Sequence, residues 1–324
     1  MRPTGKLHLG HLVGALENWK KLQSEYDCYF MVADWHALMS EYEHPAGVRE
    51  LTTEMVADWI AAGIDPQRAV IFRQSDVPEH LELYMVLSIL TPLGWVERVP
   101  TYKEQLREVK GRDLTTYGFL GYPVLQAADI LLYHPDVVPV GEDQLQHLEL
   151  TRTLARRFNN RFGKTFKEPR AFVIKETARV MALDDPARKM SKSAANTGSF
   201  ISLLDSPEEI HRKVKSAVTD SGNEIRHDLK AKPAISNLIN IYSAFSELNT
   251  SEIEKKYSGS GYAEFKKDLG KLLVMKLEPI QKKYLEFAGD KNKLIKTLSA
   301  GAKKAALTAK KTLQEAKTKV GFIV

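Results

Sequence analysis

The sequence predicts an α/β fold, in which a parallel sheet with crossover helices is followed by a smaller, all-helical domain. In the first half of the chain, short β-branched runs alternate with segments of helical periodicity. In the last third only helical patterns remain. A chain of 324 residues is long enough for two domains. We therefore expect a sheet domain at residues 1–185, a loop at 186–200 and a helical domain at 201–324.

The elements of the first domain follow from local patterns. Strands are expected at residues 28–32, 70–73, 137–140 and 172–174. A first helix begins close to residue 10 and has apolar positions on one face, at Leu12, Leu16, Trp19 and Leu22. A second helix has its apolar face at Val48, Leu51, Met55 and Trp59 and ends at Gly63. This is a Rossmann-type arrangement, in which ligands bind beyond the carboxyl ends of the strands, here residues 33–36, 74–75 and 141–144.

The second domain shows helix start signals. Ser206 to Glu209 form a capping box with Pro207 at the first helical position, and Ser251 to Glu254 offer a second box. A further helix is expected to open at residues 232–233, and residues 265–277 are apolar on one side. These patterns indicate a small helical bundle.

The amino-acid composition is that of a globular protein and excludes several other classes. Apolar residues make up 43% of the chain and charged residues 27%, as in ordinary globular proteins. The single cysteine, Cys28, excludes a disulfide framework and an iron–sulfur cluster that needs four thiolates. No apolar run is long enough to cross a bilayer, and the start of the chain lacks a signal-peptide core. We expect a cytoplasmic protein with no membrane partner.

The net charge of +6 is concentrated at the C-terminus. Residues 291–324 contain nine lysines and one acid, a net charge of +8, so the rest of the chain carries −2. Lysines commonly form the solvated face of a helix. A polyanionic partner such as RNA is the other interpretation.

The N-terminal run Thr4-Gly5-Lys6-Leu7-His8-Leu9-Gly10-His11 is typical of a phosphate site. A helix N-terminus offers backbone N–H groups, Gly10 allows close approach, and His8 and His11 add donors. Two histidines at this spacing could also be ordinary surface residues or a metal pair. A zinc set drawn from these histidines with Cys28 and His36 lacks a Cys-x-x-Cys pair, so we expect no metal site built by the protein.

A second motif, Lys189-Met190-Ser191-Lys192-Ser193, makes the first more specific. Together they resemble the nucleotide-binding motif and the mobile lysine loop of class I aminoacyl-tRNA synthetases. Three further runs are similar to those of bacterial-type tryptophanyl-tRNA synthetases, and they are residues 121–130, 138–144 and 217–221. The resemblance extends over nearly the whole chain.

The resemblance implies ATP-dependent activation of L-tryptophan and its transfer to the terminal adenosine of tRNA(Trp). His8, His11, Lys189 and Lys192 would be catalytic, and Mg²⁺ would arrive with ATP. The expected ATP-binding residues are Arg2, Gly10, His11, Asp143, Val180, Lys189, Met190, Ser191 and Lys192. The helical domain and its basic C-terminal helix would hold the tRNA and its anticodon, and the enzyme would be a homodimer.

Specificity is expected to depend on Asp129. A carboxylate inside the apolar run 124–133 needs a donor, and an indole N–H is one. Helix capping or ion pairing is the other interpretation of this aspartate. The remaining tryptophan-binding residues implied by the resemblance are His36, Tyr122, Gln126 and Gln144. Gln126 stands where many relatives have methionine, and Lys103 lies in a segment, residues 101–105, that matches the family weakly.

Three alternatives stay open. Tyrosyl-tRNA synthetases also use a buried aspartate, but residues 141–152 favour tryptophan. A nucleotidyl transferase without a tRNA partner would not need the helical domain. A catalytically impaired nucleic-acid-binding relative is motivated by residues 101–105 and by the N-terminus, because relatives commonly have a short strand ahead of the histidine motif. If that strand is lacking, the domain should be less stable.

Overall fold

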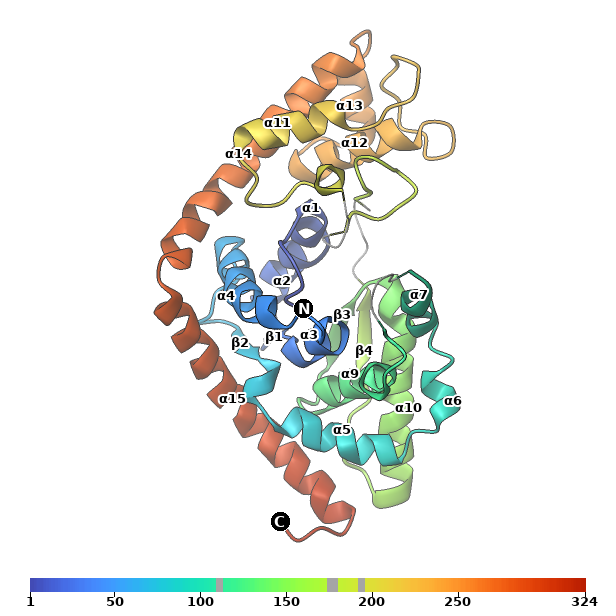
Figure 1. The fold of residues 1–324 in the computed structure, drawn as a ribbon, viewed down its shortest axis with the longest axis vertical. Coiled ribbons are helices and arrows are strands. Elements are labelled where there is room, and N and C mark those ends of the chain that lie inside the picture. The colour runs from blue at the N-terminus through green and yellow to red at the C-terminus, as the bar shows by residue number, and fades with distance from the viewer. Residues whose placement is uncertain (109–112, 174–179, 192–195) are drawn as a thin grey trace.

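The computed structural model describes residues 1–108, 113–173, 180–191 and 196–324. Figure 1 shows a strand-containing body, a bundle of helices at one end, and one long C-terminal helix that runs along the side of the body. The body contains most of the sheet domain that the sequence predicts.

All four predicted strands are present within two residues of their expected bounds. β1 (Tyr29–Val32) pairs in parallel with β2 (Val70–Arg73), and β3 (Val137–Val140) pairs in parallel with β4 (Arg170–Val173). The predicted Ile174 lies outside the described residues. Among the described residues the strands form two separate pairs rather than one continuous sheet. On the side of β1 opposite β2, the backbone of Met1 bonds to Met31 and Ala33.

The helices of the body begin with the expected one at the histidine motif. α1 (Leu9–His11), a π-helical turn η1 (Leu12–Leu16) and α2 (Glu17–Leu22) are continuous, and Leu12, Leu16 and Leu22 are buried as predicted. The predicted second helix is α4 (Ala46–Ala61). The others are α3 (Asp34–Glu41), η2 (Gln74–Asp76), α5 (Glu79–Ile89), α6 (Leu93–Val96), α7 (Pro100–Glu108), α8 (Tyr117–Leu120), α9 (Tyr122–Leu131), η3 (Glu142–Gln144) and α10 (Leu145–Phe162).

The helical bundle follows a short turn, η4 (Thr197–Ser199), and consists of α11 (Pro207–Ser216), α12 (Pro233–Phe245), α13 (Thr250–Lys256) and α14 (Tyr262–Ala288). The Ser206 side chain caps α11 by accepting from the N–H of Glu209, as predicted. The second predicted box is wrong. Asn249 and Glu252 form it instead, because Asn249 lies in extended backbone immediately before α13, whereas residue 251 is already helical.

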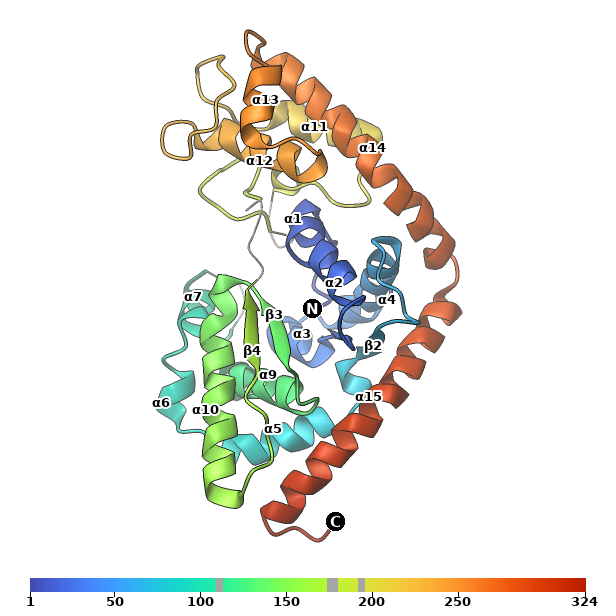
Figure 2. The same cartoon turned by 180° about the vertical axis from the view of Figure 1, so that it is seen from behind.

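The basic C-terminal helix, α15 (Lys291–Lys319), lies along the body rather than in the bundle (Figures 1 and 2). The Thr312 hydroxyl donates to the carbonyl of Leu132 at 2.8 Å, and Lys317 pairs with Glu82 of α5 at 2.9 Å. The alanines of its inner face are buried, as are Leu294, Leu298 and Leu313. The sequence assigns this helix to the helical domain, and the domain boundaries remain a prediction. In the structure the helix contacts the first domain along most of its length.

Gly301 allows α15 to lie directly against β2. A Cβ atom at this position would overlap the carbonyl oxygen of Ile71. We therefore expect Gly301→Ala to lower the free energy of unfolding by about 3 kcal/mol, because rigid backbone must move to admit the methyl group. Urea denaturation measures the change. Gly118→Ala in α8 is the matched control, since that position is open. Equal denaturation midpoints for the two variants would contradict this account of the packing.

Candidate active site

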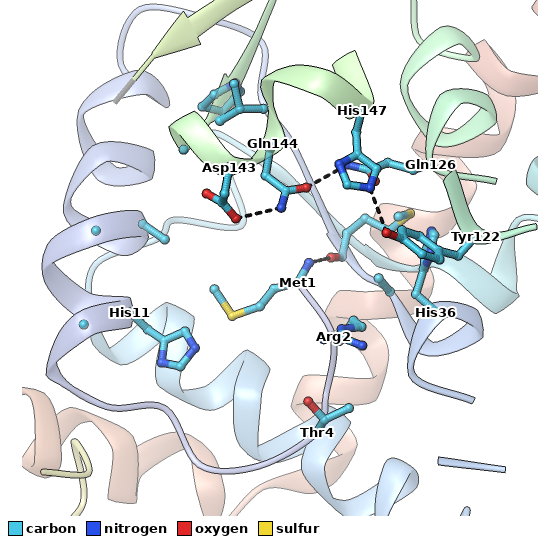
Figure 3. A pocket seen from close by; sticks show the side chains of 18 of the residues that line it. Met1, Arg2, Thr4, His11, His36, Tyr122, Gln126, Asp143, Gln144 and His147 are labelled. Carbon is cyan, nitrogen blue, oxygen red and sulfur yellow. Dashed lines mark hydrogen bonds between the residues drawn. The ribbon is translucent and has the colours of Figure 1, made fainter. Parts of the chain in front are cut away.

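One cavity of about 720 Å³ lies beyond the carboxyl ends of β1 and β3, between the histidine motif, α9, η3 and the residues that follow Val180. Figure 3 shows His11 on one side of this cavity and Tyr122, Gln144 and His147 on the other. Every predicted site residue within the described ranges lines it: Arg2, His8, Gly10, His11, His36, Tyr122, Gln126, Asp129, Asp143, Gln144, Val180, Lys189, Met190 and Ser191. Lys192 lies outside the described residues.

The two histidines of the N-terminal motif have defined orientations. Nδ1 of His8 accepts from the N–H of Gly10 at 3.1 Å, and Nδ1 of His11 accepts from the N–H of His8 at 3.3 Å. Their ring centroids lie 3.9 Å apart. Since Nδ1 acts as acceptor in both rings, a neutral ring carries its proton on Nε2. Each imidazole is therefore set up to donate from Nε2.

Gly10 forms the floor of the cavity beside these rings. A Cβ atom there would lie 3.0 Å from the ring of His8 and 3.9 Å from Cβ of Val180. The absence of a side chain keeps the gap between His8 and Val180 open. A flat group can then approach the backbone closely.

The described part of the lysine loop begins with a short antiparallel pair. Met181 pairs with Lys189, and the flanking bonds run from Ala182 N–H to the Arg188 carbonyl at 2.8 Å and from Met190 N–H to the Val180 carbonyl at 3.2 Å. The side chains of Val180 and Met190 are both buried. The pair brings Lys189 to the same cavity as the histidines.

Asp129 is buried at the opposite end and already has three hydrogen-bond partners. Its Oδ1 accepts from Gln74 Nε2 and pairs with His80 Nδ1, both at 2.7 Å, and its Oδ2 pairs with His36 Nε2 at 2.8 Å. Burial alone would raise the pKa of this carboxyl, but hydrogen bonds and charge from His36 and His80 outweigh it and hold the pKa well below its usual range. The carboxylate is therefore ionised, and Oδ2 has the spare acceptor capacity.

A second polar group lines the cavity near Tyr122. The Tyr122 hydroxyl bonds to Nε2 of His147 at 2.9 Å. Burial lowers the pKa of His147, although the charge of Asp143 opposes it, so the ring is neutral. The Gln144 side chain donates to Asp143 at 2.8 Å and accepts from Gln126 at 3.4 Å (Figure 3). These amides and the tyrosine hydroxyl provide both donors and acceptors.

Sequence reasoning missed three residues of this site. Gln74 was expected at the crevice but without a role, His147 was only part of the run that favours tryptophan, and His80 was not singled out. His80 also bonds to the Tyr133 hydroxyl at 2.8 Å, which fixes the ring against Asp129. Both rings are buried in the structure, and a histidine within a largely apolar helical segment is the sequence signal that could have found His80. Arg2 donates to Ser40 at 3.4 Å, so its guanidinium reaches α3.

The family model for class I tRNA synthetases of the tryptophan and tyrosine type matches residues 1–278. The chain belongs to this family. The synthetase is 44% identical over 324 residues to tryptophan–tRNA ligase 2 of Streptomyces avermitilis, covering all of this chain and 96% of the relative. Its structure is similar to tryptophanyl-tRNA synthetase from Mycoplasma pneumoniae, with a TM-score of 0.89 and 33% identity over 100% of this chain and 96% of the other.

A third comparison includes bound ligands. The Campylobacter jejuni tryptophanyl-tRNA synthetase in complex with ADP and tryptophan has a TM-score of 0.85 and 34% identity, covering 99% of this chain and 98% of that one. Within residues 1–108, 113–173, 180–191 and 196–324, the synthetase has no cluster of three potential metal ligands. No described helix is both long and apolar enough to span a bilayer.

Proposed function

We propose that this synthetase is a tryptophan–tRNA ligase. It activates L-tryptophan with ATP to tryptophanyl-adenylate and transfers the amino acid to the 3′-terminal adenosine of tRNA(Trp). The observation that supports tryptophan most directly is the ionised Asp129, whose side chain is 8% exposed, at the end of the cavity. Relatives that resemble the chain over its whole length are named for the same reaction.

In this proposal the indole N–H donates to Oδ2 of Asp129, the carboxylate oxygen with only one partner among the described residues. His36 and Gln74 fix the carboxylate from two sides. Tyr122, Gln126 and Gln144 then meet the ammonium and carboxylate of the amino acid. A phenylalanine side chain would leave an acceptor site on Oδ2 unpaired, which is the strongest basis for rejecting an apolar analogue.

ATP binds in the other half of the cavity. Gly10 and Val180 lie against the adenosine with Met190 beside them, and Asp143 accepts from the ribose hydroxyls. His8 and His11 donate from Nε2 to the phosphates, and Lys189, Ser191 and Lys192 neutralise and bind the triphosphate together with Arg2. Mg²⁺ accompanies the nucleotide, since phosphate oxygens are its preferred ligands.

The reaction needs no nucleophile from the protein. A carboxylate oxygen of tryptophan attacks the α-phosphorus, the bond from that phosphorus to the bridging oxygen breaks, and pyrophosphate leaves with the electron pair. The protein holds two anions in line and stabilises the charge on the departing group. In the second step a ribose hydroxyl of the tRNA attacks the tryptophanyl carbonyl, and AMP leaves.

Amino-acid-dependent exchange of labelled pyrophosphate into ATP tests the activation step. Tryptophan and tyrosine are supplied in separate reactions with the same enzyme preparation. Exchange with tryptophan alone supports the proposal. Exchange with tyrosine alone would indicate a tyrosyl-tRNA synthetase, and exchange with neither would favour a nucleic-acid-binding relative without activity.

The tRNA is proposed to lie against residues 201–324. Seven lysines of α15 are exposed and suit a phosphate backbone, at positions 291, 293, 296, 303, 304, 310 and 311. The anticodon would be recognised by the helical bundle. The proposal includes a cytoplasmic location, because the tRNA substrate is found there and the single cysteine suits a reducing compartment.

We also propose a homodimer, formed through apolar side chains on α5 and α6. Met85 and Ile89 lie one helical turn apart and are 58% and 72% exposed, and Leu93 is 63% exposed. Grouped apolar side chains of this size mark protein interfaces. A second copy is the occupant that the family resemblance implies.

Ile89→Glu is expected to convert the dimer to a monomer, because a charge would be buried in the interface without a partner. Light scattering at micromolar concentration should give twice 36.6 kDa for the wild type and 36.6 kDa for the variant. Leu229→Glu, at an exposed leucine of the bundle, is the control and should stay dimeric. A wild-type monomer would contradict the proposed dimer.

A further inference from the structure

Asn237 is a buried polar residue on an otherwise apolar face of α12. Its side chain is 3% exposed, and its neighbours Ile235, Leu238 and Ile239 are at most 1% exposed. An amide in such surroundings is costly unless its donor and acceptor are both satisfied. Asn237 is satisfied by one residue outside the bundle. Its Oδ1 accepts from the Met181 N–H at 2.9 Å, and its Nδ2 donates to the Met181 carbonyl at 3.1 Å.

The backbone geometry explains why Met181 is available for this contact. Met181 pairs with Lys189, but the hydrogen bonds of the pair come from the flanking residues Ala182 and Met190. In an antiparallel pair of this kind, the N–H and C=O of the central residue point away from the partner strand. The side-chain amide of Asn237 hydrogen-bonds to both groups, as the backbone of a neighbouring strand would.

This contact connects the bundle to the active site. Val180, Lys189 and Met190 line the cavity, and all three lie within one residue of the Met181–Lys189 pair. α12 is a central helix of the bundle, with its core positions fully buried. The side chain of Asn237 therefore holds the base of the lysine loop at a fixed place on the bundle. It lies outside the cavity lining itself.

We propose that Asn237 is a positioning residue for adenylate formation, which locks the Met181 backbone to α12 and thereby sets where Lys189 and Met190 meet ATP. The inference rests on the proposed function. Lys189 acts on the departing pyrophosphate, so a small displacement of its backbone reduces stabilisation of the transition state. Tryptophan binds at the other end of the cavity, around Asp129, and is not affected.

Asn237→Ala and Asn240→Ala form a matched pair on the same helix. Oδ1 of Asn240 accepts from Nε2 of His227 at 2.9 Å, and Asn240 has no described contact with the loop. Asn237→Ala should lower kcat of tryptophan-dependent pyrophosphate exchange about 30- to 100-fold and raise KM for ATP. KM for tryptophan should change by less than about twofold. Asn240→Ala should keep kcat and both KM values within about threefold of the wild type.

Amide hydrogen exchange provides a readout that does not depend on activity. In Asn237→Ala the N–H of Met181 should exchange faster, while the amides of α12 keep their protection. Asn237→Asp keeps an acceptor for that N–H but loses the donor to the carbonyl, so it should fall between the wild type and Asn237→Ala in both assays. This variant also serves if the alanine variant does not fold.

The possible outcomes distinguish a failure of the positioning role of Asn237 from a failure of the proposed ligase function. The positioning role would be overturned if Asn237→Ala and Asn240→Ala lowered kcat equally. It would also be overturned if amide hydrogen exchange of Met181 were unchanged in Asn237→Ala. An equal rise in KM for tryptophan and ATP would also overturn it, since that indicates general disorder. A wild-type enzyme without tryptophan-dependent activity would instead refute the proposed function. Amide hydrogen exchange at Met181 would then still test whether Asn237 holds the Met181 backbone.

Discussion

Asp129→Asn should lower kcat/KM for tryptophan by about 10³-fold or more and should remove most of the preference for tryptophan over phenylalanine. The physical reason is the number of donors around this side chain. Both carboxylate oxygens already accept from His36, Gln74 or His80. An amide nitrogen at either position would face a donor, and the charge that favours the indole N–H would be lost. Pyrophosphate exchange at varied tryptophan and phenylalanine concentrations measures both effects.

Asp136→Asn is the matched control for this prediction. Asp136 lies a few residues further along, with a side chain 63% exposed beside Lys167, and should tolerate the change. Thermal unfolding of both variants shows how much of the loss is due to the fold. An Asp129→Asn enzyme that still rejects phenylalanine as the wild type does would mean that Asp129 does not recognise the indole.

Lys189→Ala should lower kcat for adenylate formation by about 10²- to 10³-fold with little change in KM for tryptophan. Lys189 lines the part of the cavity that we propose for the triphosphate, where additional negative charge builds up as pyrophosphate departs. The interaction is therefore stronger in the transition state than in the ground state. Pre-steady-state measurement of adenylate formation isolates this step.

The control for Lys189→Ala is Lys167→Ala, at a lysine whose side chain is 53% exposed and which is not among the residues that line the cavity. It should keep the wild-type rate. A Lys189 variant in which KM for tryptophan rises as much as kcat falls would contradict a role confined to the phosphates.

Much of the fold could be predicted because the local signals agreed with the tertiary structure. β-branched runs predicted all four strands. Of the apolar positions predicted for the first two helices, five are buried and three are half-buried; the buried ones are Leu12, Leu16, Leu22, Met55 and Trp59, and the half-buried ones are Trp19, Val48 and Leu51. The predicted site residues that the structure describes line one cavity, which lies beyond the carboxyl ends of β1 and β3, as expected for parallel strands. The motifs at residues 8–11 and 189–191 thus come together although nearly 180 residues separate them.

Other features depend on tertiary contacts that local patterns do not contain. The position of α15 depends on the close approach of Gly301 to β2. A glycine in a lysine-rich helix does not indicate which strand the helix packs against. The second helix cap was predicted at Ser251 but is Asn249, because backbone conformation as well as residue type determines which residue caps a helix. The network of Asp129 with Gln74 and His80 connects three separate elements, so the sequence predicted only that the carboxylate needs a donor.

Charging of a tRNA(Trp) transcript with labelled tryptophan tests the central claim most directly. The proposal predicts ATP-dependent formation of tryptophanyl-tRNA, released by mild base, with no charging of tRNA(Trp) by tyrosine and none of a tRNA(Tyr) transcript by either amino acid. Tyrosine attached to tRNA(Tyr), or tryptophan-dependent pyrophosphate exchange without any charging of tRNA(Trp), would contradict it.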